Sequence, residues 1–369
     1  MNSSDGTGRF SVCFNALFLQ NHLGGIGNYA YHLIRNIRAL RPEWSLTLLI
    51  PKYAAGHFRS LEGVQLLEVD QPSRTGRLIY FHMIFPFLVR RFDLLHSVGN
   101  MGMLICPIRQ IITIHDLYEQ VSPERFSSAK RFLMKFLISW SGRGAAAILT
   151  DSLSTKRDIG SYYPHLLEKT RVVYLGNKFP VEAMGYNRPR KNFIFVGTIE
   201  PGKNLIHILQ GFAAFRKRHP ERLKVVGATG WGQSSIPAQL DSLGIRDCVD
   251  FLGYVPDSEL KDIYAGSLAL IVASNYEGFG LPVIEAMACG CPVICARNSS
   301  LVEAGGDCAL FFETGDISGM TSRMEEIYRD ADLRQKRIEA GFAHAGAFKW
   351  EKTASESADV YESVIHSGK

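Results

Sequence analysis

The sequence has no uncharged apolar run of the roughly 18 residues that a membrane-spanning helix requires. Its first nine residues are polar and glycine-rich, which is not the pattern of a secretory signal peptide. The seven cysteines are an odd number without a repeated Cys-x-x-Cys spacing, so they predict reduced thiols and not a disulfide framework. We therefore expect a cytoplasmic protein without membrane-spanning segments.

Metal-binding and nucleic-acid-binding patterns are also missing. Cys289, Cys291 and Cys295 lie close together, but a helix end and a buried strand use such residues as small packing groups. Asp330 and Asp332 have a D-x-D spacing found in some metal sites, yet they sit in a charged helical run far from any predicted strand end. We expect no metal cofactor. The absence of helix-turn-helix, zinc-finger and aromatic RNA-binding motifs argues against nucleic acid as a partner.

Positive charge is concentrated in the first half of the chain. Residues 1–180 carry 21 Lys and Arg against 12 Asp and Glu, whereas the remainder carries 20 against 24. Residues 127–144 interleave basic side chains with phenylalanine, leucine and tryptophan, and residues 81–91 are first apolar and then basic. This pattern predicts either peripheral contact with an anionic membrane surface, at its inner face, or an ordinary helix with a solvated basic side.

Short apolar runs alternate with amphipathic stretches along the chain. The length of 369 residues favours two domains, and the alternation predicts an α/β fold with parallel sheets covered by helices. The polar segment 176–191 resembles an interdomain linker. The predicted strands are 10–14, 45–50, 94–96, 111–115 and 147–150, followed by a second series at 171–174, 192–196, 223–226, 249–252, 268–272 and 293–295. The predicted helices include 29–39, 127–141, 205–218, 258–265, 319–329 and 350–366.

One segment near residue 280 carries most of the recognisable chemistry. Glu277 and Glu285 stand eight positions apart, with Gly280 and Pro282 between them. Proline at the first helical position is preorganised, so we expect a helix from Pro282 to about Ala288. The free N–H groups at the helix start favour a phosphate, and the two carboxylates can accept from hydroxyl groups. The combination predicts a site for a nucleotide sugar.

Other candidate residues follow predicted strands, which is where ligands bind in parallel sheets. Gly24, Gly25 and Gly27 lie between the first strand and a helix. Glycine there tolerates positive φ and lets a phosphate or sugar approach the backbone, although a plain turn would use the same residues. His115 closes a predicted strand, and Lys203 follows another.

The segment YEGFGLPVIEAMACGCPVI resembles the E-x7-E motif of retaining glycosyltransferases, in particular glycosyltransferase family four and its mannosyltransferase-like branch. The segments GGIGNY, TIHDL, VGTIEPGKNL, LGYVPDSELKDIYAGS and FKWEKTA match in the same order, so the resemblance covers nearly the whole chain. It implies a GT-B fold, in which two Rossmann-like, doubly wound parallel-sheet domains face a central cleft. The expected parts are an acceptor-binding domain at 1–178, a nucleotide-sugar-binding domain at 179–347 and a helix at 348–369 that crosses back to the first domain.

The resemblance also implies roles for individual residues. His115 would position the donor sugar, with Asp116 either orienting it or capping a helix. Lys203 would neutralise the departing diphosphate. Glu277 would accept from a C3 or C4 hydroxyl of the sugar, and Glu285 from the ribose hydroxyls. The other expected donor contacts are Gly24, Gly25, Gly27, Thr198, Gly253, Tyr254, Val255, Phe279, Gly280 and Leu281.

The implied activity is metal-independent, retaining transfer of mannose from GDP-mannose to a hydroxyl of a polysaccharide or lipid-linked oligosaccharide. The sequence departs from the family at Thr198 and Gly202, where relatives usually carry an arginine, so the diphosphate site is one cation short. Three alternatives stay open. They are a UDP-sugar donor in the same fold, a nucleotide-sugar 2-epimerase, and a nucleotide-sugar-binding subunit without turnover.

Overall fold

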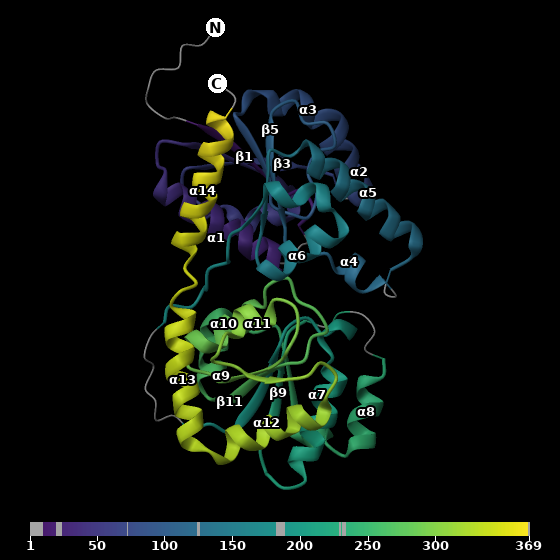
Figure 1. Cartoon of the computed structure of the whole chain (residues 1–369), viewed down its shortest axis with the longest axis vertical. Coiled ribbons are helices and arrows are strands. Elements are labelled where there is room, and N and C mark those ends of the chain that lie inside the picture. The colour runs from purple at the N-terminus through teal and green to yellow at the C-terminus, as the bar shows by residue number, and fades with distance from the viewer. Residues whose placement is uncertain are drawn as a thin grey trace. The chain divides into compact units, whose positions relative to one another are not determined.

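The computed structural model describes residues 10–19, 24–71, 73–123, 126–181, 189–228, 230 and 234–367 (Figure 1). The chain divides into two compact units. Unit 1 comprises Met1–Gly176 together with Lys349–Lys369, and unit 2 comprises Asn177–Phe348. The last helix therefore belongs to unit 1, although it follows unit 2 in the sequence.

Unit 1 is built on a seven-stranded sheet in which the described strands pair in parallel. The strand order β3-β2-β1-β4-β5-β6-β7 changes direction next to β1, which is the doubly wound arrangement. The strands are β1 (Ser11–Asn15), β2 (Ser45–Pro51), β3 (Val64–Val69), β4 (Leu94–Ser97), β5 (Arg109–Ile114), β6 (Ala147–Thr150) and β7 (Thr170–Val172).

Helices cover the sheet of unit 1 because their apolar residues recur at helical spacing. The last helix, α14, packs along α1, where the Trp350 ring stacks on His32 with centroids 4.9 Å apart. The helices are α1 (Gly25–Leu40), α2 (Arg74–Ile79), α3 (Phe85–Leu88), α4 (Tyr118–Val121), α5 (Ser128–Gly144), α6 (Leu153–Tyr162) and α14 (Trp350–His366). The 3-10 and π turns of unit 1 include η1 (Lys52–Phe58), η2 (Tyr80–Ile84), η3 (Val89–Arg91) and η5 (Pro164–Lys169).

Unit 2 repeats this plan with a six-stranded parallel sheet in the order β10-β9-β8-β11-β12-β13. Its strands are β8 (Asn192–Val196), β9 (Arg222–Val226), β10 (Val249–Gly253), β11 (Ser267–Val272), β12 (Val293–Ala296) and β13 (Leu310–Phe312). Its helices are α7 (Leu205–Arg216), α8 (Ile236–Leu243), α9 (Asp257–Ala265), α10 (Leu281–Ala288), α11 (Leu301–Gly305), α12 (Ile317–Arg329) and α13 (Ala331–Ala345), with turns η6 (Pro201–Lys203) and η7 (Arg246–Cys248).

The predicted α/β class with two doubly wound parallel sheets is confirmed. Two strands lie outside the prediction: β3 is a half-buried edge strand without a continuous apolar run, and β13 has only three residues. The run at 171–174, predicted to open the second series, contributes β7 to the edge of the first sheet. Helix α1 begins four residues earlier than predicted. The prediction missed this start because the glycines in the first turn have low helix propensity.

None of the helices in the described ranges combines the length and the apolar character that crossing a bilayer requires.

Close backbone packing joins the carboxyl ends of β8, β9 and β10. The Gly227 N–H donates to the Gly253 carbonyl at 2.8 Å, and the Gly197 N–H donates to the Val226 carbonyl at 3.0 Å. Gly227 has a φ of +140°, and a Cβ there would clash with the Gly197 carbonyl oxygen. Glycine at this position therefore allows three strand ends to meet at the edge where ligands bind in such sheets.

We expect Gly227→Ala to destabilise unit 2, because the new methyl group meets backbone that hydrogen bonds hold in place. Overpacking typically costs about 1–3 kcal/mol. Gly244→Ala is the matched control, since Gly244 also has a positive φ, of +65°, but has open space around it. Urea unfolding of the full chain, followed by hydrogen exchange in β8–β10, measures both variants. Equal losses of stability would contradict the clash.

Candidate active site

Lys203 and Glu277 meet at the carboxyl edge of the unit 2 sheet. Lys203 ends the turn η6 after β8, and Glu277 lies in the loop between β11 and α10. Lys203 Nζ donates to Glu277 Oε1 at 2.6 Å, and Ser274 Oγ donates to the same oxygen at 2.7 Å. Among the residues that the structure describes, none hydrogen-bonds to Glu277 Oε2, and the side chain is 18% exposed. Glu277 thus has one anchored oxygen and one that can accept from a ligand hydroxyl.

The loop that carries Glu277 is braced from both sides. Ser299, with a φ of +41°, accepts the Glu277 N–H through its Oγ at 3.0 Å. Ser300 Oγ donates to the Glu277 carbonyl at 2.7 Å. On the β8 side, Asn204 donates to the Ala273 carbonyl at 2.8 Å. Sequence reasoning missed Asn204, Ser299 and Ser300, although polar residues after β8 and β12 were an available signal.

The start of α10 has the geometry that its sequence predicts. The helix begins at Leu281, one residue before Pro282, and Gly280 precedes it with a φ of +98°. A Cβ on Gly280 would lie 3.0 Å from the Leu301 side chain, so this turn requires glycine. The Phe279 ring is buried against other side chains, so a ligand contact from this residue would come from its backbone. The N–H groups of this helix start are suited to an anion.

Glu285, one turn inside α10, is more enclosed than the sequence suggests. Lys178 Nζ lies 3.6 Å from Glu285 Oε1 and donates to Asp257 Oδ1 at 2.6 Å. Burial raises the pKa of the Glu285 carboxyl, and the Lys178 ammonium partly opposes that rise. The Glu285 side chain is 9% exposed, so only a narrow edge is open to a ribose hydroxyl.

The remaining unit 2 candidates lie at the ends of β8 and β10. Thr198 is exposed just after β8. Gly253 ends β10 with a φ of +66°, the Tyr254 side chain that follows is 81% exposed, and Val255 is buried. This arrangement offers an open aromatic face beside a glycine turn.

In unit 1, His115 follows β5 and is held by groups from two neighbouring loops. Its Nδ1 lies 2.6 Å from Asp151 Oδ2, and its Nε2 donates to the Val98 carbonyl at 2.8 Å. The His115 N–H donates to Asn100 Oδ1 at 2.9 Å. Because both ring nitrogens are bonded inside unit 1, the geometry suits a positioning role better than proton transfer.

The charge of His115 is set by Asp151, which sequence reasoning missed. Burial by itself lowers the pKa of His115, but the Asp151 carboxylate and the hydrogen bonds to Asp151 and Val98 outweigh burial and raise it. Burial raises the pKa of Asp151, and His115 opposes that rise. Asp116 Oδ1 accepts the Tyr118 N–H at 3.2 Å at the start of α4. The N-cap of α4 is Leu117 and not Asp116, so the capping alternative for Asp116 is wrong, whereas its carboxylate acts on the charge of His115.

The glycine segment begins α1. Gly24 and Gly25 are exposed, and a Cβ on either would meet nothing within 4 Å. Gly24 has a φ of −83°, so this residue does not use the positive φ that glycine tolerates. Gly27 is buried in the first turn of α1. The part of the chain that the structure describes therefore does not itself require glycine at 24 and 25.

The other sequence candidates have packing or capping roles. Burial raises the pKa of the Cys289, Cys291 and Cys295 thiols. Asp330 caps α13 by accepting the Leu333 N–H at 2.8 Å. Within the described ranges, no group of three or more His, Cys, Asp or Glu side chains is arranged to hold a metal ion.

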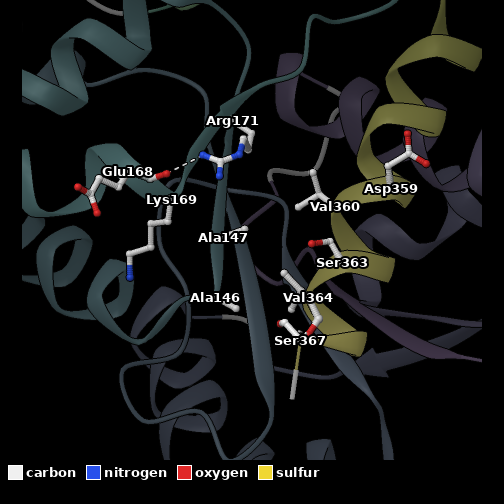
Figure 2. Close-up of a pocket in the computed structure, with 10 residues that line it drawn as sticks. All are labelled: Ala146, Ala147, Glu168, Lys169, Arg171, Asp359, Val360, Ser363, Val364 and Ser367. Atoms are coloured by element: carbon white, nitrogen blue, oxygen red, sulfur yellow. Dashed lines mark hydrogen bonds between the residues drawn. The ribbon is translucent and has the colours of Figure 1, made fainter. Parts of the chain in front are cut away.

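A pocket in unit 1 lies apart from these residues (Figure 2). It is bounded by the start of β6, by η5 and β7, and by the end of α14. The Arg171 side chain turns toward η5 and donates to the Glu168 carbonyl at 2.6 Å. Ala146 and Ala147 place it at the amino end of β6, whereas His115 and Asp151 lie at the carboxyl ends of β5 and β6.

Comparison with known proteins assigns the chain to a family. Residues 182–344 match the family model described as glycosyl transferases group 1, and residues 23–176 match that of glycosyltransferase family 4. The chain is 30% identical over 319 residues to the O-antigen chain mannosyltransferase RfbU of Salmonella typhimurium, covering 82% of this chain and 87% of the relative. The chain belongs to glycosyltransferase family 4. It is thus a glycosyltransferase, and the resemblance seen in the sequence is confirmed.

Two further similarities agree with this assignment. The chain is 27% identical over 372 residues to O-antigen chain mannosyltransferase B of Escherichia coli, covering 92% of this chain and 96% of the relative. The structure of HepE from Anabaena in complex with UDP and glucose has a TM-score of 0.76 at 17% identity, covering 96% of this chain and all of that one. The fold of this glycosyltransferase is therefore of GT-B type.

We expect Lys203 and Glu277 to be energetically coupled, because their charged groups are partly buried and in direct contact at 2.6 Å. A double-mutant cycle of Lys203→Met and Glu277→Gln, measured by urea unfolding of the full chain, should give a coupling free energy of about 0.5–3 kcal/mol. The cycle of Lys203→Met with Ser322→Ala, on the exposed side of α12, is the control for additivity. Additive effects of Lys203→Met and Glu277→Gln would show that the ion pair contributes nothing to stability.

Proposed function

We propose that this glycosyltransferase is a retaining enzyme that moves mannose from GDP-mannose to a hydroxyl of a polysaccharide or lipid-linked oligosaccharide. The observation that carries the proposal is the Lys203–Glu277 pair beside the start of α10. It sets a cation for a diphosphate next to an acceptor for sugar hydroxyls. The full-length similarity to two mannosyltransferases supports mannose as the sugar.

Unit 2 supplies the groups proposed to hold the donor. Glu277 accepts a sugar hydroxyl at its Oε2, and Lys203 contacts the diphosphate. Glu285 takes the ribose hydroxyls at its exposed edge. The backbone groups of Phe279, Gly280 and Leu281 contact sugar and phosphate, Thr198 lines the diphosphate site, and Gly253, Tyr254 and Val255 lie under the base.

Unit 1 supplies two further elements of the proposal. The N–H groups at Gly24, Gly25 and Gly27 lie at the start of α1, where they favour an anionic or hydroxyl-bearing ligand. His115 positions the donor sugar through the loops that it ties together. Since its ring nitrogens are bonded within unit 1, His115 is not proposed to move a proton.

The proposed reaction is a displacement on one face of the sugar. A bond forms between the acceptor oxygen and C1 as the bond from C1 to the diphosphate oxygen breaks. The acceptor proton passes to the departing diphosphate oxygen, so no protein base is required. The sugar develops positive charge while the diphosphate develops negative charge, and Lys203 with the α10 start stabilises the latter. No metal is proposed for this step.

A UDP-sugar donor is the second candidate. The observation that favours it is the similarity in fold to HepE, whose structure contains UDP and glucose. In the proposed site the base is contacted mainly by backbone at 253–255, and backbone contacts of this kind do not distinguish one base by side-chain chemistry.

Donor preference is tested by calorimetry with GDP, UDP and ADP, and then with the matching nucleotide sugars, in the absence of added metal. We expect GDP to bind and GDP-mannose to bind at least as well. Lys203→Met should weaken GDP binding because it removes the cation at the diphosphate. Glu277→Gln should not weaken GDP binding, because Lys203 then shares less of its charge with residue 277, and it should lower transfer by about 10²-fold or more, as loss of a transition-state contact does.

Each outcome has a distinct consequence. Preference for UDP would replace the donor and keep the site. Wild-type transfer by Glu277→Gln would overturn the site assignment. Tight donor binding without transfer to any acceptor would favour a binding subunit, and free epimerised nucleotide sugar would favour a 2-epimerase.

A second partner is proposed for one side of unit 1, which we call the basic apolar face. Residues 71–92 and 126–150 contain no Asp or Glu, and neither do residues 94–115, in which the connection 98–108 joins β4 to β5. Figure 1 shows α3, α2 and α5 along this side. Leu104 N–H donates to His82 of η2, and Gly102 N–H donates to Ser141 of α5, so the connection joins the two helical segments. The exposed large apolar side chains of the face are Ile79, Met83, Ile84, Phe87, Leu88, Ile105, Phe132, Leu133, Phe136 and Trp140.

The composition of this face fits a bilayer that contains anionic lipid. Apolar side chains stand out from the surface by half or more of their area, as Met83 (67%), Phe87 (72%) and Phe132 (75%) do. Basic residues are interspersed with them in the sequence, and Glu119, which lies near Lys130 and Arg74, is largely buried, so the exposed charge of this face favours negative headgroups. We propose that the basic apolar face docks on such a membrane, where a lipid-linked acceptor would be found.

Binding to vesicles tests this contact. Vesicles with anionic phospholipid should retain the protein at low salt, and vesicles of neutral lipid should not. Phe132→Ser combined with Phe87→Ser should release it without changing GDP binding. Val181→Ser, at an exposed apolar residue of unit 2, is the control. Equal retention of the wild type and the double variant would rule out the face.

A further inference from the structure

A chain of buried polar side chains runs from the last helix of unit 1 into its sheet. His96, on β4, lies between Tyr361 of α14 and Thr113 of β5. The distances are 2.5 Å from Nδ1 to the Tyr361 hydroxyl and 2.7 Å from Nε2 to Thr113 Oγ1. Thr113 Oγ1 is 2.9 Å from the hydroxyl of Tyr29, on α1. All four side chains are buried.

This chain ends against His115. The rings of Tyr29 and His115 meet edge to face, with centroids 4.8 Å apart at 81°. Thr113 and His115 are two residues apart, and side chains alternate along a strand, so both lie on the same side of the sheet. Ile114 pairs with Thr150 in the β5–β6 register, which sets His115 opposite Asp151 one residue further on. The His115 imidazole is therefore contacted by Asp151 and also by the Tyr29 ring.

Burying these four polar side chains costs free energy that buried apolar side chains would not. Apolar side chains of similar volume would fill the same core without the need to satisfy each buried donor and acceptor. Burial lowers the pKa of His96 to about 3, so this ring is neutral. The four side chains are therefore coupled through the direction of their hydrogen bonds and not through charge. The neutral His96 ring donates one of its two hydrogen bonds and accepts the other. The hydroxyl group on one side of the ring must therefore accept, and the one on the other side must donate.

We propose that Asp151 and Tyr361 are positioning residues for His115. Asp151 fixes the ring orientation and charge through Nδ1. Tyr361 acts through His96, Thr113 and Tyr29, and holds the Tyr29 ring edge against the other side of the imidazole. The last helix of the chain thereby supports a residue at the carboxyl edge of the unit 1 sheet. This inference rests on the proposed role of His115 in sugar transfer.

The charge of His115 gives the proposal a signature in pH. The groups that face its ring are the Asp151 and Asp116 carboxylates, the neutral His96, the Val98 carbonyl and the Tyr29 ring. Since its pKa is raised, the stability that the pair contributes is present in full below the ordinary histidine pKa and is lost as pH rises through the folded value. Without the Asp151 charge, burial would lower the pKa of His115 instead.

The test compares transfer by full-length variants across pH. Asp151→Asn should lower kcat by about 10- to 100-fold, as loss of a partner that orients a ligating histidine does. The pKa of His115, read from its ring signals by NMR, should fall by about 1–3 units, and the basic limb of kcat should move with it. Tyr361→Phe should give a smaller loss in kcat with an unchanged donor KM. Thr113→Val should do the same, and Thr113→Ser should restore the rate.

Controls separate positioning from general loss of stability. Tyr163→Phe removes a buried hydroxyl of unit 1 that has no hydrogen-bond partner in the part of the chain that the structure describes, so its kcat should match that of the wild type. Wild-type transfer by His115→Ala would remove the proposed role of His115 itself. If His115→Ala is impaired while Asp151→Asn and Tyr361→Phe keep wild-type kcat and pH profile, the positioning proposal is wrong and the role of His115 stands.

Discussion

Because the strand pairs described in both sheets are parallel, neighbouring strands deliver their carboxyl ends to the same edge. Residues far apart in the sequence become neighbours there without any local signal. Lys203 and Glu277 follow β8 and β11, which are adjacent in the sheet of unit 2. His115 and Asp151 follow β5 and β6, which are adjacent in unit 1. The pairing pattern therefore creates both sets of polar groups, and the side chains only specify their chemistry.

In each unit, a basic side chain pairs with a carboxylate at the carboxyl edge of the sheet. In unit 2 the Lys203 ammonium faces the Glu277 carboxylate, and in unit 1 the His115 imidazole faces Asp151. Such pairs are costly to desolvate, and their attraction offsets that cost only when further hydrogen bonds fix the geometry. Ser274 provides one for Glu277, and the Val98 carbonyl provides one for His115. Charged groups are thus held in place before any ligand arrives.

The sequence predicts a structural feature well when the residues that determine it are neighbours in the sequence. The start of α10 depends on Gly280 and Pro282, which stand beside it, so its position was predictable to within one residue. The partnership of His115 with Asp151 spans 36 positions and depends on the β5–β6 register, which no periodicity reveals. The enclosure of Glu285 depends on Lys178, which lies at the start of unit 2 and far from Glu285 in the sequence. Strand β3 was not predicted because an edge strand needs no continuous apolar run.

In the proposed donor site, the exposed Thr198 stands where the resemblance leads one to expect an arginine, and this would change the task of Lys203. With its charge already shared with Glu277, Lys203 can attract a diphosphate only by dividing its hydrogen bonds between two anions. An arriving diphosphate would weaken the contact of Lys203 with Glu277 Oε1, which Ser274 would still hold, and would leave more negative charge on Glu277 for the sugar hydroxyl at Oε2. Contact with the diphosphate and contact with the sugar would then be linked through one ammonium group. A site with a separate arginine would carry these two tasks on different side chains, and its sugar contact would respond less to the phosphate.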